Sequence, residues 1–510
     1  MPTPRIAFRT DANSEIGTGH FMRCLTLADE LHQNGSKIYF ISRGLPINLK
    51  NMLRMREITL LELTINLNSD DVDELQHSNW LTTSQGRDAA QTIALLGEVK
   101  LNWIIVDHYA IDQRWESQLR SLALNILVID DLADRKHDCD VLLDQNFYSN
   151  KHERYLRKVP KNCHMLLGPE FALLRKEFRD RRCLIKPRTG DVKNILVSFG
   201  GFDSQNFTTV ALKALIKLNW DVHVNVVVGK NHPELREIET LCRSRNFDLH
   251  IQTSNMAHLM AQADLAIGAG GTSLWERICM GLPTICMVAA DNQKKQITDL
   301  QKEGLVDVVE EKKDLIDSVY LRLYKYTNEF NTREISQKLI DMVDGYGAIK
   351  VCDLLINGFV QIRLADESDS KNIFAWRNHP FIRKSSISTD EINWNDHNTW
   401  FEDKCGKVNS PILIGEIDHK PIGVVRFDID KDISDVSIYL VPEKSNRGLG
   451  TKLLSAAENW LAINRSNVKT VRAFVLCGNE ASIKLFARLK YIKTSEADQF
   501  KFVKKVWPIF

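Results

Sequence analysis

The first third of the chain alternates short apolar runs with stretches of helical periodicity. Runs that are apolar almost throughout predict strands buried on both faces, because a half-exposed strand alternates apolar and polar residues. Such strands are typical of parallel sheets covered by helices on both sides. The predicted strands are Ile38–Ile41, Ile58–Leu61, Trp103–Val106, Ile126–Ile129 and Val141–Leu143.

A glycine-rich loop precedes this series and joins a predicted strand at Ile6–Phe8 to a predicted helix that ends at Gly35. The apolar face of that helix consists of Phe21, Leu25, Ala28 and Leu31. The loop reads Gly17-Thr-Gly19-His20, so His20 lies in the first helical turn. Free N–H groups and the helix dipole at that end suit an anion, or a neutral histidine that accepts a proton from water. The alternative is a tight turn in which His20 is an exposed polar residue.

Polar residues follow several predicted strands, at Asp107-His-Tyr109, Asp130-Asp131 and Asp144-Gln-Asn146. In open α/β sheets, ligands bind in the crevice at the carboxyl ends of the strands. An Asp after a strand more often caps a helix or forms a turn. The repetition of the pattern at one edge favours a polar cleft.

A second α/β series follows a basic stretch, Arg175–Arg182, which we interpret as a helix end and an interdomain connection. A charge run of this kind is usually a solvated face rather than a nucleic-acid site. The next predicted strands are Asn194–Phe199, Val224–Val228, His250–Gln252, Asp264–Ile267 and Pro283–Val288.

Two glycine loops in this second series each follow a strand. One contains Gly200 and Gly201, and the other runs through Gly268, Gly270 and Gly271 into a helix that carries further polar residues, Thr272, Ser273 and Glu276. Glycine lets a backbone approach a diphosphate closely, and successive N–H groups bind its charge. The last strand leads into a predicted loop, Asp291-Asn292-Gln293.

The final third of the chain has a different, α+β pattern. Asp366–Ser370 predicts a cap for a helix through Ile373 and Arg377, and Asn446–Thr451 predicts a loop that opens another helix. The apolar face of that second helix consists of Leu453, Leu454, Ala457 and Leu461. The predicted strands, mostly with hairpin spacing, are Ile362–Leu364, Ile412–Ile417, Ile422–Phe427, Val436–Leu440 and Val471–Leu476.

Composition restricts the class of protein. A chain of 510 residues predicts two or three domains, and 67 Lys plus Arg against 66 Asp plus Glu gives no field that favours nucleic acid or an anionic membrane. The ten cysteines lack CxxC or Cys/His zinc spacing and predict a reducing compartment without a metal site. No apolar run reaches membrane-spanning length, so we expect a cytoplasmic enzyme.

The two α/β halves resemble the GT-B architecture of nucleotide-sugar enzymes, in particular the lipid II-forming N-acetylglucosaminyltransferase. In that family a glycine loop and helix hold the diphosphate, a Glu on the helix binds ribose, and a Gln reaches the sugar. The resemblance implies that these roles fall on Gly270, Gly271, Thr272, Ser273, Glu276 and Gln293, with Asn292 as a further sugar contact.

The first half departs from that transferase and resembles the UDP-sugar hydrolase of pseudaminic acid biosynthesis. The similarity rests on Asp11, on the loop from Gly17 to Arg23, on Asp107-His-Tyr109, and on the glycine loops of the second half. It implies that water attacks the anomeric carbon of UDP-2,4-diacetamido-2,4,6-trideoxy-β-L-altropyranose with inversion, and that His20 is the catalytic base. It also implies a UDP-sugar site formed by Gly17, Gly19, Arg23, Asp107, Gly200 and Gly201, without a metal.

Residues 360–510 resemble a GNAT acetyltransferase, in which the loop and helix after a strand bind the pyrophosphate of acetyl-CoA. The implied acetyl-CoA contacts are Leu440, Arg447, Gly448, Leu449, Gly450, Thr451, Asn479 and Phe486. A Tyr that often protonates the departing thiolate is replaced by Phe486, and Tyr491 or Tyr439 could substitute. The acceptor pocket falls near Trp376, Arg377, His397 and Trp400, although His397 fits a packing role better.

Together these patterns predict a GT-B fold, with Rossmann-like domains at 1–180 and 190–345, followed by a GNAT domain at 360–510. The predicted enzyme acetylates the 4-amino group of a UDP-amino sugar from acetyl-CoA and then releases UDP hydrolytically. Two alternatives stay open. One is a GT-B glycosyltransferase that passes the sugar to an acceptor, and the other is a non-catalytic UDP-sugar-binding module tethered to an acetyltransferase.

Overall fold

The structure is a computed structural model that divides into two compact units, Met1–Ile356 and Asn357–Phe510. It describes residues 3–13, 15–64, 73–189, 191–201, 203–309, 314–327, 332–386, 388–417, 420–444, 448–465, 467–496 and 499–505. Within these ranges the side chains of residues 291, 292, 443, 495 and 496 are not described.

The first half of the first unit is built on a parallel sheet. Its strands are β1 (Arg5–Thr10), β2 (Lys37–Arg43), β3 (Thr59–Leu63), β4 (Leu101–Asp107), β5 (Ala123–Ile129), β6 (Val141–Asp144) and β7 (His164–Leu167). In the described chain they lie in the order β3-β2-β1-β4-β5-β6-β7. All predicted strands of this half are confirmed, whereas the short β7 was not predicted.

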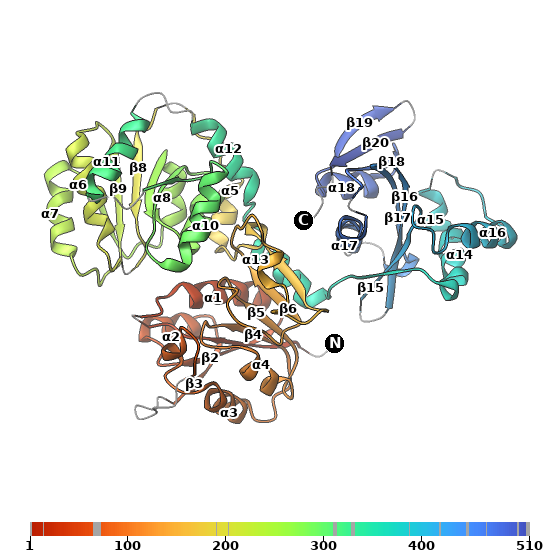
Figure 1. Ribbon diagram of the computed structural model, residues 1–510, viewed down its shortest axis with the longest axis horizontal. Coiled ribbons are helices and arrows are strands. Elements are labelled where there is room, and N and C mark those ends of the chain that lie inside the picture. Colours follow the sequence, from red (N-terminus) through yellow and green to blue (C-terminus); the bar gives the residue numbers. More distant parts are fainter. Residues whose placement is uncertain are drawn as a thin grey trace. The chain divides into compact units, whose positions relative to one another are not determined.

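Helices cover both faces of this sheet (Figure 1). They are α1 (Gly19–Gln33), α2 (Ile47–Arg54), α3 (Gln85–Leu96) and α4 (Gln113–Leu119), with the short turns η1 (Ser78–Leu81), η2 (Glu153–Tyr155) and η3 (Pro169–Phe171). Figure 1 shows α1 and α2 on one face and α3 and α4 on the other. The predicted apolar face of α1 is buried, and Gly35 follows the helix with a left-handed φ of 84°, as its capping position requires.

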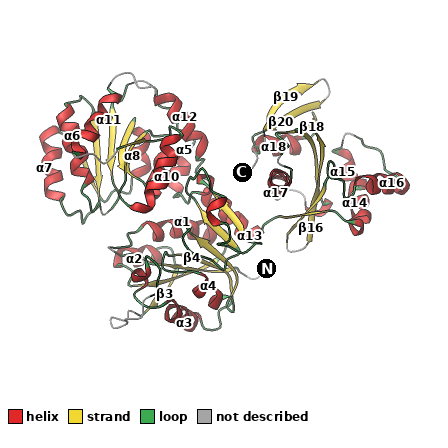
Figure 2. Ribbon diagram, viewed as in Figure 1, coloured by secondary structure: helices red, strands yellow, loops and turns green. Residues whose placement is uncertain are grey.

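The second half contains another parallel sheet, in the order β10-β9-β8-β11-β12-β13 among the described residues. The strands are β8 (Asn194–Ser198), β9 (His223–Val228), β10 (Asp248–Ile251), β11 (Leu265–Ala269), β12 (Thr284–Met287) and β13 (Asp307–Val308). The helices are α6 (Phe207–Leu218), α7 (Leu235–Arg245), α8 (Met256–Gln262), α9 (Thr272–Cys279), α10 (Asp291–Lys302), α11 (Leu315–Tyr326) and α12 (Thr332–Met342). Figure 2 shows the strands of this sheet between helical layers.

The predicted loop at Asp291–Gln293 is wrong, because these residues form the first turn of α10. Ile297 and Leu300 lie three residues apart on α10 and are both buried. This spacing is typical of a helix that packs one face on the core. Asn292 and Gln293 therefore belong to a helix N-terminus that follows β12. The second half also contains one strand that was not predicted, β13, which follows the predicted strand at Pro283–Val288.

Two helices tie the halves of the first unit together. The basic stretch forms α5 (Lys176–Arg182), and Arg179 of this helix pairs with Glu30 of α1 at 2.8 Å. The chain then returns to the first half through α13 (Gly347–Asn357), where the indole Nε1 of Trp103 donates to the carbonyl of Leu355 at 3.1 Å. This return of the last helix was not predicted.

The second unit is a mixed sheet, in the order β14-β15-β16-β17-β18-β20-β19 among its described residues. The strands are β14 (Gln361–Leu364), β15 (Ile412–Ile417), β16 (Lys420–Asp430), β17 (Ile433–Leu440), β18 (Thr470–Leu476), β19 (Ile492–Glu496) and β20 (Gln499–Lys505). Its helices are α14 (Ser370–Asn378), α15 (Pro380–Lys384), α16 (Trp394–Lys404), α17 (Leu449–Asn464) and α18 (Glu480–Arg488), with turns η4 (Glu367–Asp369) and η5 (Pro442–Lys444). The predicted antiparallel strands and the Asp366 cap are confirmed.

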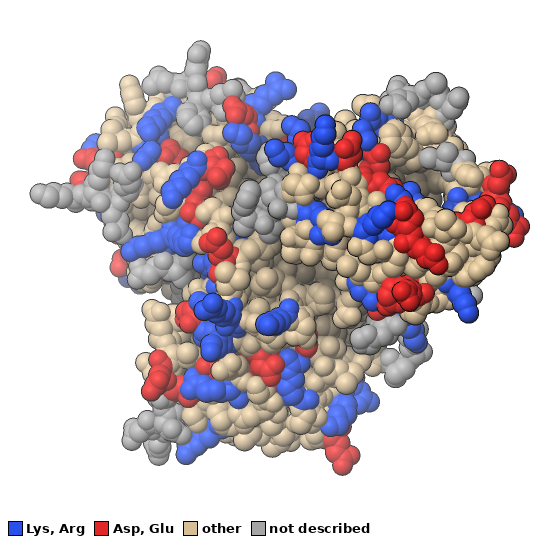
Figure 3. Space-filling model, turned by 45° about the vertical axis from the view of Figure 1, so that its right-hand side comes forward, with Lys and Arg blue, Asp and Glu red and all other residues tan. Residues whose placement is uncertain are grey.

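The molecular surface carries mixed charge. On the face drawn in Figure 3, Lys and Arg side chains are interspersed with Asp and Glu, as the net charge of +1 suggests. Among the described residues, no helix is both long and apolar enough to cross a membrane.

Candidate functional site

The opening loop presents His20 at the start of α1. Gly17 adopts a left-handed φ of 76° and α1 begins at Gly19, so His20 lies in the first turn as predicted. The ring nitrogen Nδ1 of His20 lies 2.6 Å from Oδ1 of Asp107. An ionised carboxylate only accepts hydrogen bonds, so Nδ1 carries the proton and donates it. Nε2 is then the unprotonated nitrogen, as a general base requires.

Asp107 is held in its ionised form by Arg23. The guanidinium donates through Nε at 2.6 Å and through Nη2 at 2.7 Å to the two oxygens of Asp107. Burial alone would raise the pKa of this carboxyl, but the Arg23 charge and the hydrogen bonds from Arg23 and His20 hold the pKa of Asp107 well below its usual range. His20, Arg23 and Asp107, which the sequence placed in one site, are thus in direct contact.

The polar side chains at the strand ends form a hydrogen-bonded cluster that includes Asp131 as well as Asp107. Asp131 accepts hydrogen bonds from the Tyr109 hydroxyl at 2.5 Å, from Nη1 of Arg23 at 3.2 Å and from Nδ2 of Asn146 at 3.3 Å. Burial and the neighbouring Asp131 raise the pKa of Tyr109, so its hydroxyl stays a donor. The strand-end pattern pointed to Asp131, Tyr109 and Asn146 but could not tell which of their contacts form.

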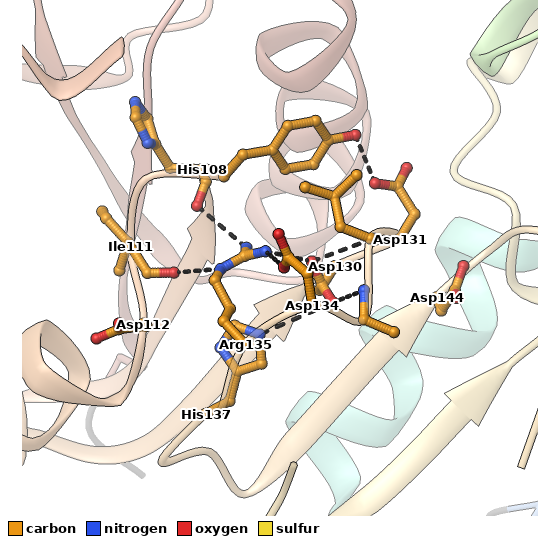
Figure 4. A network of polar contacts seen from close by, with 12 residues as sticks. His108, Ile111, Asp112, Asp130, Asp131, Asp134, Arg135, His137 and Asp144 are labelled. Carbon is orange, nitrogen blue, oxygen red and sulfur yellow. Dashed lines mark hydrogen bonds and ion pairs between the residues drawn. The ribbon is translucent and has the colours of Figure 1, made fainter. Parts of the chain in front are cut away.

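Asp130, the neighbour of Asp131, has a structural role. Its carboxylate lies 2.9 Å from Nη1 of Arg135 and accepts from the backbone N–H of Ala133, and His137 lies 3.8 Å away. Figure 4 shows Asp130 against Arg135 and His137, and Asp131 turned away from them. Asp130 therefore forms a turn, whereas Asp131 belongs to the cluster around His20, and its part in a ligand cleft stays a prediction.

Aromatic rings surround His20, and sequence reasoning missed two of them. The ring of Tyr109 meets that of His20 edge-on at 4.6 Å between centroids, and Trp80 stacks on Tyr109 at 5.3 Å. His77 packs on Trp80 at 4.6 Å. Trp80 and His77 come from η1 and the residue before it, in a polar stretch with no strand or helix periodicity that could have marked them.

The second half supplies a glycine loop at the start of α9. A Cβ at Gly270 would lie 2.8 Å from Cδ1 of Ile297 and 2.9 Å from the side-chain oxygen of Gln293, so a larger residue would require these two side chains to move. Arg277, fully buried and also missed from the sequence, donates to the carbonyl of Ala269 and holds the loop from below. The loop is thus a rigid backbone surface at a helix N-terminus, which suits an anion.

The opening loop lies close to this second loop. A Cβ placed on Gly19 would contact Oγ1 of Thr272 at 3.9 Å. Glu276, one turn into α9, pairs with Arg175 at 3.1 Å, and burial raises the pKa of Glu276. Gly271, Thr272, Ser273 and Gln293 line the same end of α9, whereas the Asn292 side chain lies outside the described residues.

The loop of Gly200 and Gly201 follows β8 in the same half. Gly200 has a left-handed φ of 87°, and a Cβ at either glycine would meet open space. Asp203 fixes the end of the loop, since its carboxylate accepts from the backbone N–H groups of Phe207 and Thr208 at 2.9 and 2.8 Å. This loop is a second open stretch of backbone near the carboxyl edge of the sheet.

In the second unit, α17 begins with a glycine N-cap at Gly448, whose φ is 70°. The first N–H groups of a helix have no intrahelical acceptors, which here applies to Leu449 and Gly450, whereas the N–H of Thr451 donates to the carbonyl of Gly448 at 3.2 Å. Among the described residues, β17 pairs with β18 over Ile433–Asp435, yet β17 continues to Leu440 beyond that ladder. The strands therefore separate toward the end that leads to α17. Arg447 lies outside the described residues.

Several other residues predicted in this unit have structural partners. Phe486 is buried in the core between Tyr491 and Phe502. Asn479 caps α18 by accepting from the N–H of Ser482 at 3.1 Å. The Tyr491 hydroxyl donates its proton to a hydrogen bond with Glu458. Of the two tyrosines that could protonate the thiolate, Tyr439 is the one that is not held by this bond.

The residues of the predicted acceptor pocket have different surroundings. His397 is buried, and its Nε2 lies 3.0 Å from the carbonyl of Ser370, which fits the packing role. Trp400 lies 5.6 Å beneath the Arg426 guanidinium. Nη1 of Arg377 is buried without a hydrogen-bond partner among the described residues. No three His, Cys, Asp or Glu side chains in the described part of the chain are grouped as for a metal ion.

Comparison with known proteins agrees with this division. Residues 371–491 match the acetyltransferase (GNAT) family, and residues 194–338 match the glycosyltransferase family 28 C-terminal domain. An uncharacterised protein of Methanocaldococcus jannaschii is 24% identical over 98% of this chain and 99% of its own length. The chain thus joins a GT-B unit to a GNAT domain, the latter typical of acetyl-CoA-dependent enzymes.

Two relatives match the first unit. The UDP-2,4-diacetamido-2,4,6-trideoxy-β-L-altropyranose hydrolase of Campylobacter jejuni is 26% identical over 59% of this chain and 97% of its own length. The spore coat polysaccharide biosynthesis protein SpsG of Bacillus subtilis is 30% identical over 29% of this chain and 44% of its own length. The first unit is therefore homologous to sugar-modifying proteins.

Proposed function

We propose that the chain is a bifunctional nucleotide-sugar enzyme of the pseudaminic acid pathway. Its first unit hydrolyses UDP-2,4-diacetamido-2,4,6-trideoxy-β-L-altropyranose to UDP and the free sugar. Its GNAT domain acetylates the 4-amino group of the precursor UDP-amino sugar from acetyl-CoA. The single observation that carries the hydrolase is the His20–Asp107 pair, with Nε2 left as acceptor beside the loop of α9.

In the hydrolytic step, Nε2 of His20 takes a proton from water as the water oxygen bonds to the anomeric carbon. The bond between that carbon and the diphosphate oxygen breaks on the opposite face, so the anomeric configuration inverts and UDP leaves. Asp107 stabilises the imidazolium that forms. N–H groups at Gly270 to Ser273 and the α9 dipole stabilise charge on the departing UDP.

In the acetyl-transfer step, the neutral 4-amino nitrogen attacks the thioester carbonyl; a C–N bond forms, the C–S bond breaks, and the nitrogen releases one proton to solvent. The N–H groups of Leu449 and Gly450 at the start of α17, with the Thr451 hydroxyl beside them, would hold the CoA pyrophosphate. Burial raises the pKa of Tyr439, which keeps its hydroxyl able to protonate the departing thiolate. The buried, unpartnered Nη1 of Arg377 suits an anionic acceptor such as a nucleotide sugar.

Acetylation precedes hydrolysis in this scheme, because the hydrolase substrate carries both acetamido groups. Joining the two steps in one chain raises the local concentration of the intermediate. The free cysteines of the described chain suit the reducing cytoplasm, where we place the enzyme. A glycosyltransferase is the second candidate, favoured by the family 28 match over residues 194–338.

One assay tests these roles. The full chain receives UDP-4-amino-4,6-dideoxy-AltNAc and acetyl-CoA without a sugar acceptor, and free CoA and UDP are followed with time. We expect CoA to appear first and UDP afterwards. His20→Asn should stop UDP release and leave CoA release intact. UDP release by that variant at the parent rate would contradict the base assignment, and UDP release that needs an added acceptor would favour the glycosyltransferase.

A further inference from the structure

Trp275 connects the loop-bearing helix of the second half to the first half. It lies on α9 between Ser273 and Glu276 and is fully buried. Its indole Nε1 donates to Oδ1 of Asn146 at 2.9 Å. Asn146 follows β6 at the carboxyl edge of the first sheet and is 8% exposed. This buried hydrogen bond therefore joins the helix proposed to bind UDP to the polar cluster around His20.

The chemistry of its neighbours fixes the orientation of the Asn146 amide. An indole N–H only donates and an ionised carboxylate only accepts, so the amide oxygen must face Trp275 and the amide nitrogen must face Asp131. Nδ2 of Asn146 donates to Oδ2 of Asp131 at 3.3 Å. Neither Asp nor Leu at this position could make both bonds.

From Asp131 the contacts lead to the proposed base. Nη1 of Arg23 donates to Oδ2 of Asp131, the same oxygen that accepts from Asn146. The other nitrogens of Arg23 hold both oxygens of Asp107, and Asp107 accepts from His20. A continuous path of hydrogen bonds thus runs from Trp275 through Asn146, Asp131, Arg23 and Asp107 to His20.

We infer that Trp275 and Asn146 are positioning residues that couple the seating of α9 to the orientation of His20. The inference rests on the proposed hydrolysis. When α9 is in place, Asn146 holds Asp131, and Asp131 holds the far side of the Arg23 guanidinium. Arg23 then keeps Asp107 oriented toward Nδ1 of His20. A shift of α9 would loosen this series and misplace Nε2 relative to the attacked carbon.

Two substitutions break one link each. Trp275→Phe removes the indole N–H and keeps an aromatic ring. Asn146→Asp is isosteric and still accepts from Trp275, but it cannot donate to Asp131. The matched control is Trp115→Phe, because Trp115 is also fully buried and its Nε1 donates to Asp88 at 2.9 Å. Asp88 pairs with Arg9 and Arg43, not with His20.

The measurement is UDP release by the full chain from the diacetamido substrate, together with the inhibition constant of UDP and the melting temperature. We expect Trp275→Phe and Asn146→Asp each to lower kcat by about tenfold, since a small misplacement of a base is costly. The inhibition constant of UDP should stay within about twofold, because the glycine loop is unchanged. The double variant should lose little more than either single one, since both act on one path.

Trp115→Phe should lower the melting temperature to a similar degree and leave kcat unchanged. Equal kcat losses in Trp275→Phe and Trp115→Phe, or additive losses in the double variant, would overturn the inference.

A second readout uses ¹⁵N NMR of the imidazoles, with the His20 signal identified by its loss in His20→Asn. We expect the Nδ1-protonated form in the parent and a mixture of tautomers in Asn146→Asp. An unchanged His20 signal would contradict the coupling, even if Trp275→Phe does not fold. If the parent chain releases no UDP, the proposed hydrolysis fails, and this spectrum still tests the coupling.

Discussion

Helices α1 and α17 both begin at or next to a glycine, yet the two proposed sites use different kinds of chemical group. At the opening loop the chemistry lies in side chains, with His20, Arg23 and Asp107 locked together by buried charge. At α17 the proposed binding groups are backbone N–H groups after Gly448, and the residues that follow are mainly small or apolar. We therefore propose different roles for the two helix starts, a catalytic base at one and pyrophosphate binding at the other, because the neighbouring strands supply different side chains.

This contrast predicts that the two proposed sites lose function in response to different kinds of substitution. A side-chain site should fail when one functional group changes and its backbone stays the same. A backbone site should tolerate changes of side-chain chemistry but fail when its N–H groups are blocked or repelled. The following variants are ordered by the size of the expected effect.

The largest effect is expected for Asp107→Asn. The amide removes the charge that stabilises the imidazolium and can favour the wrong tautomer of His20, so kcat for UDP release should fall by about 10³-fold or more. Asp88→Asn is the control, because it also replaces a buried, Arg-paired carboxylate outside the His20 network. Comparable loss of kcat in both variants at temperatures where both are folded would show a general stability effect instead.

Gly448→Asp tests the backbone site. It introduces an anion where the pyrophosphate would bind, at a position with φ of 70°, and should lower kcat/KM for acetyl-CoA by about 10²-fold. UDP release from the pre-acetylated sugar should not change. Gly406→Asp is the control, since Gly406 also has a positive φ and open space but lies in another loop of the domain. An equal fall of kcat/KM for acetyl-CoA in Gly448→Asp and Gly406→Asp would contradict a pyrophosphate site at α17.

Trp80→Ala tests the aromatic wall of the side-chain site. Trp80 stacks on Tyr109 beside His20, so its loss should raise KM for the sugar nucleotide by about tenfold and leave inhibition by UDP alone nearly unchanged. Trp80→Phe should restore most of the loss. Equal weakening of UDP and of the sugar nucleotide would place Trp80 outside the sugar site.

The smallest effect concerns the buried charge beneath the first site. His137 lies 2.7 Å from Glu116, and although burial lowers its pKa, the Glu116 and Asp130 charges raise the pKa of His137 to about 9. A raised folded-state pKa gives stability that is complete below the unfolded value near 6.5 and is lost as pH rises through about 9. Unfolding in urea at pH 6.5 and pH 9 should reveal about 1–3 kcal/mol of loss. In His137→Gln that pH difference should shrink; an unchanged difference would contradict the assignment.

Local patterns predicted most of the fold. Continuous apolar runs identified the strands of both parallel sheets, and the helical spacing of Leu453, Leu454, Ala457 and Leu461 identified α17. What the patterns missed was short or dependent on tertiary contacts. The strand β7 has four residues, and α10 begins at Asp291 because Ile297 and Leu300 pack against the sheet.

The candidate site was predictable to the extent that it was local. His20 and Arg23 lie on one helical turn, and Asp107 ends a strand, so motif and pattern identified all three. Trp80 lies in a polar stretch, and Trp275 reads as a core residue of an amphipathic helix. Their contacts with Tyr109 and Asn146 depend on how distant segments pack, which no local pattern records.

The central claim is that His20 activates water to attack the anomeric carbon. The most direct test is hydrolysis of the diacetamido substrate in H₂¹⁸O without an acceptor, with mass spectrometry of both products and NMR of the fresh sugar. We predict ¹⁸O at the anomeric carbon of an inverted sugar, unlabelled UDP, and neither product from His20→Asn. Label in the phosphate of UDP, or a retained anomer, would contradict the account.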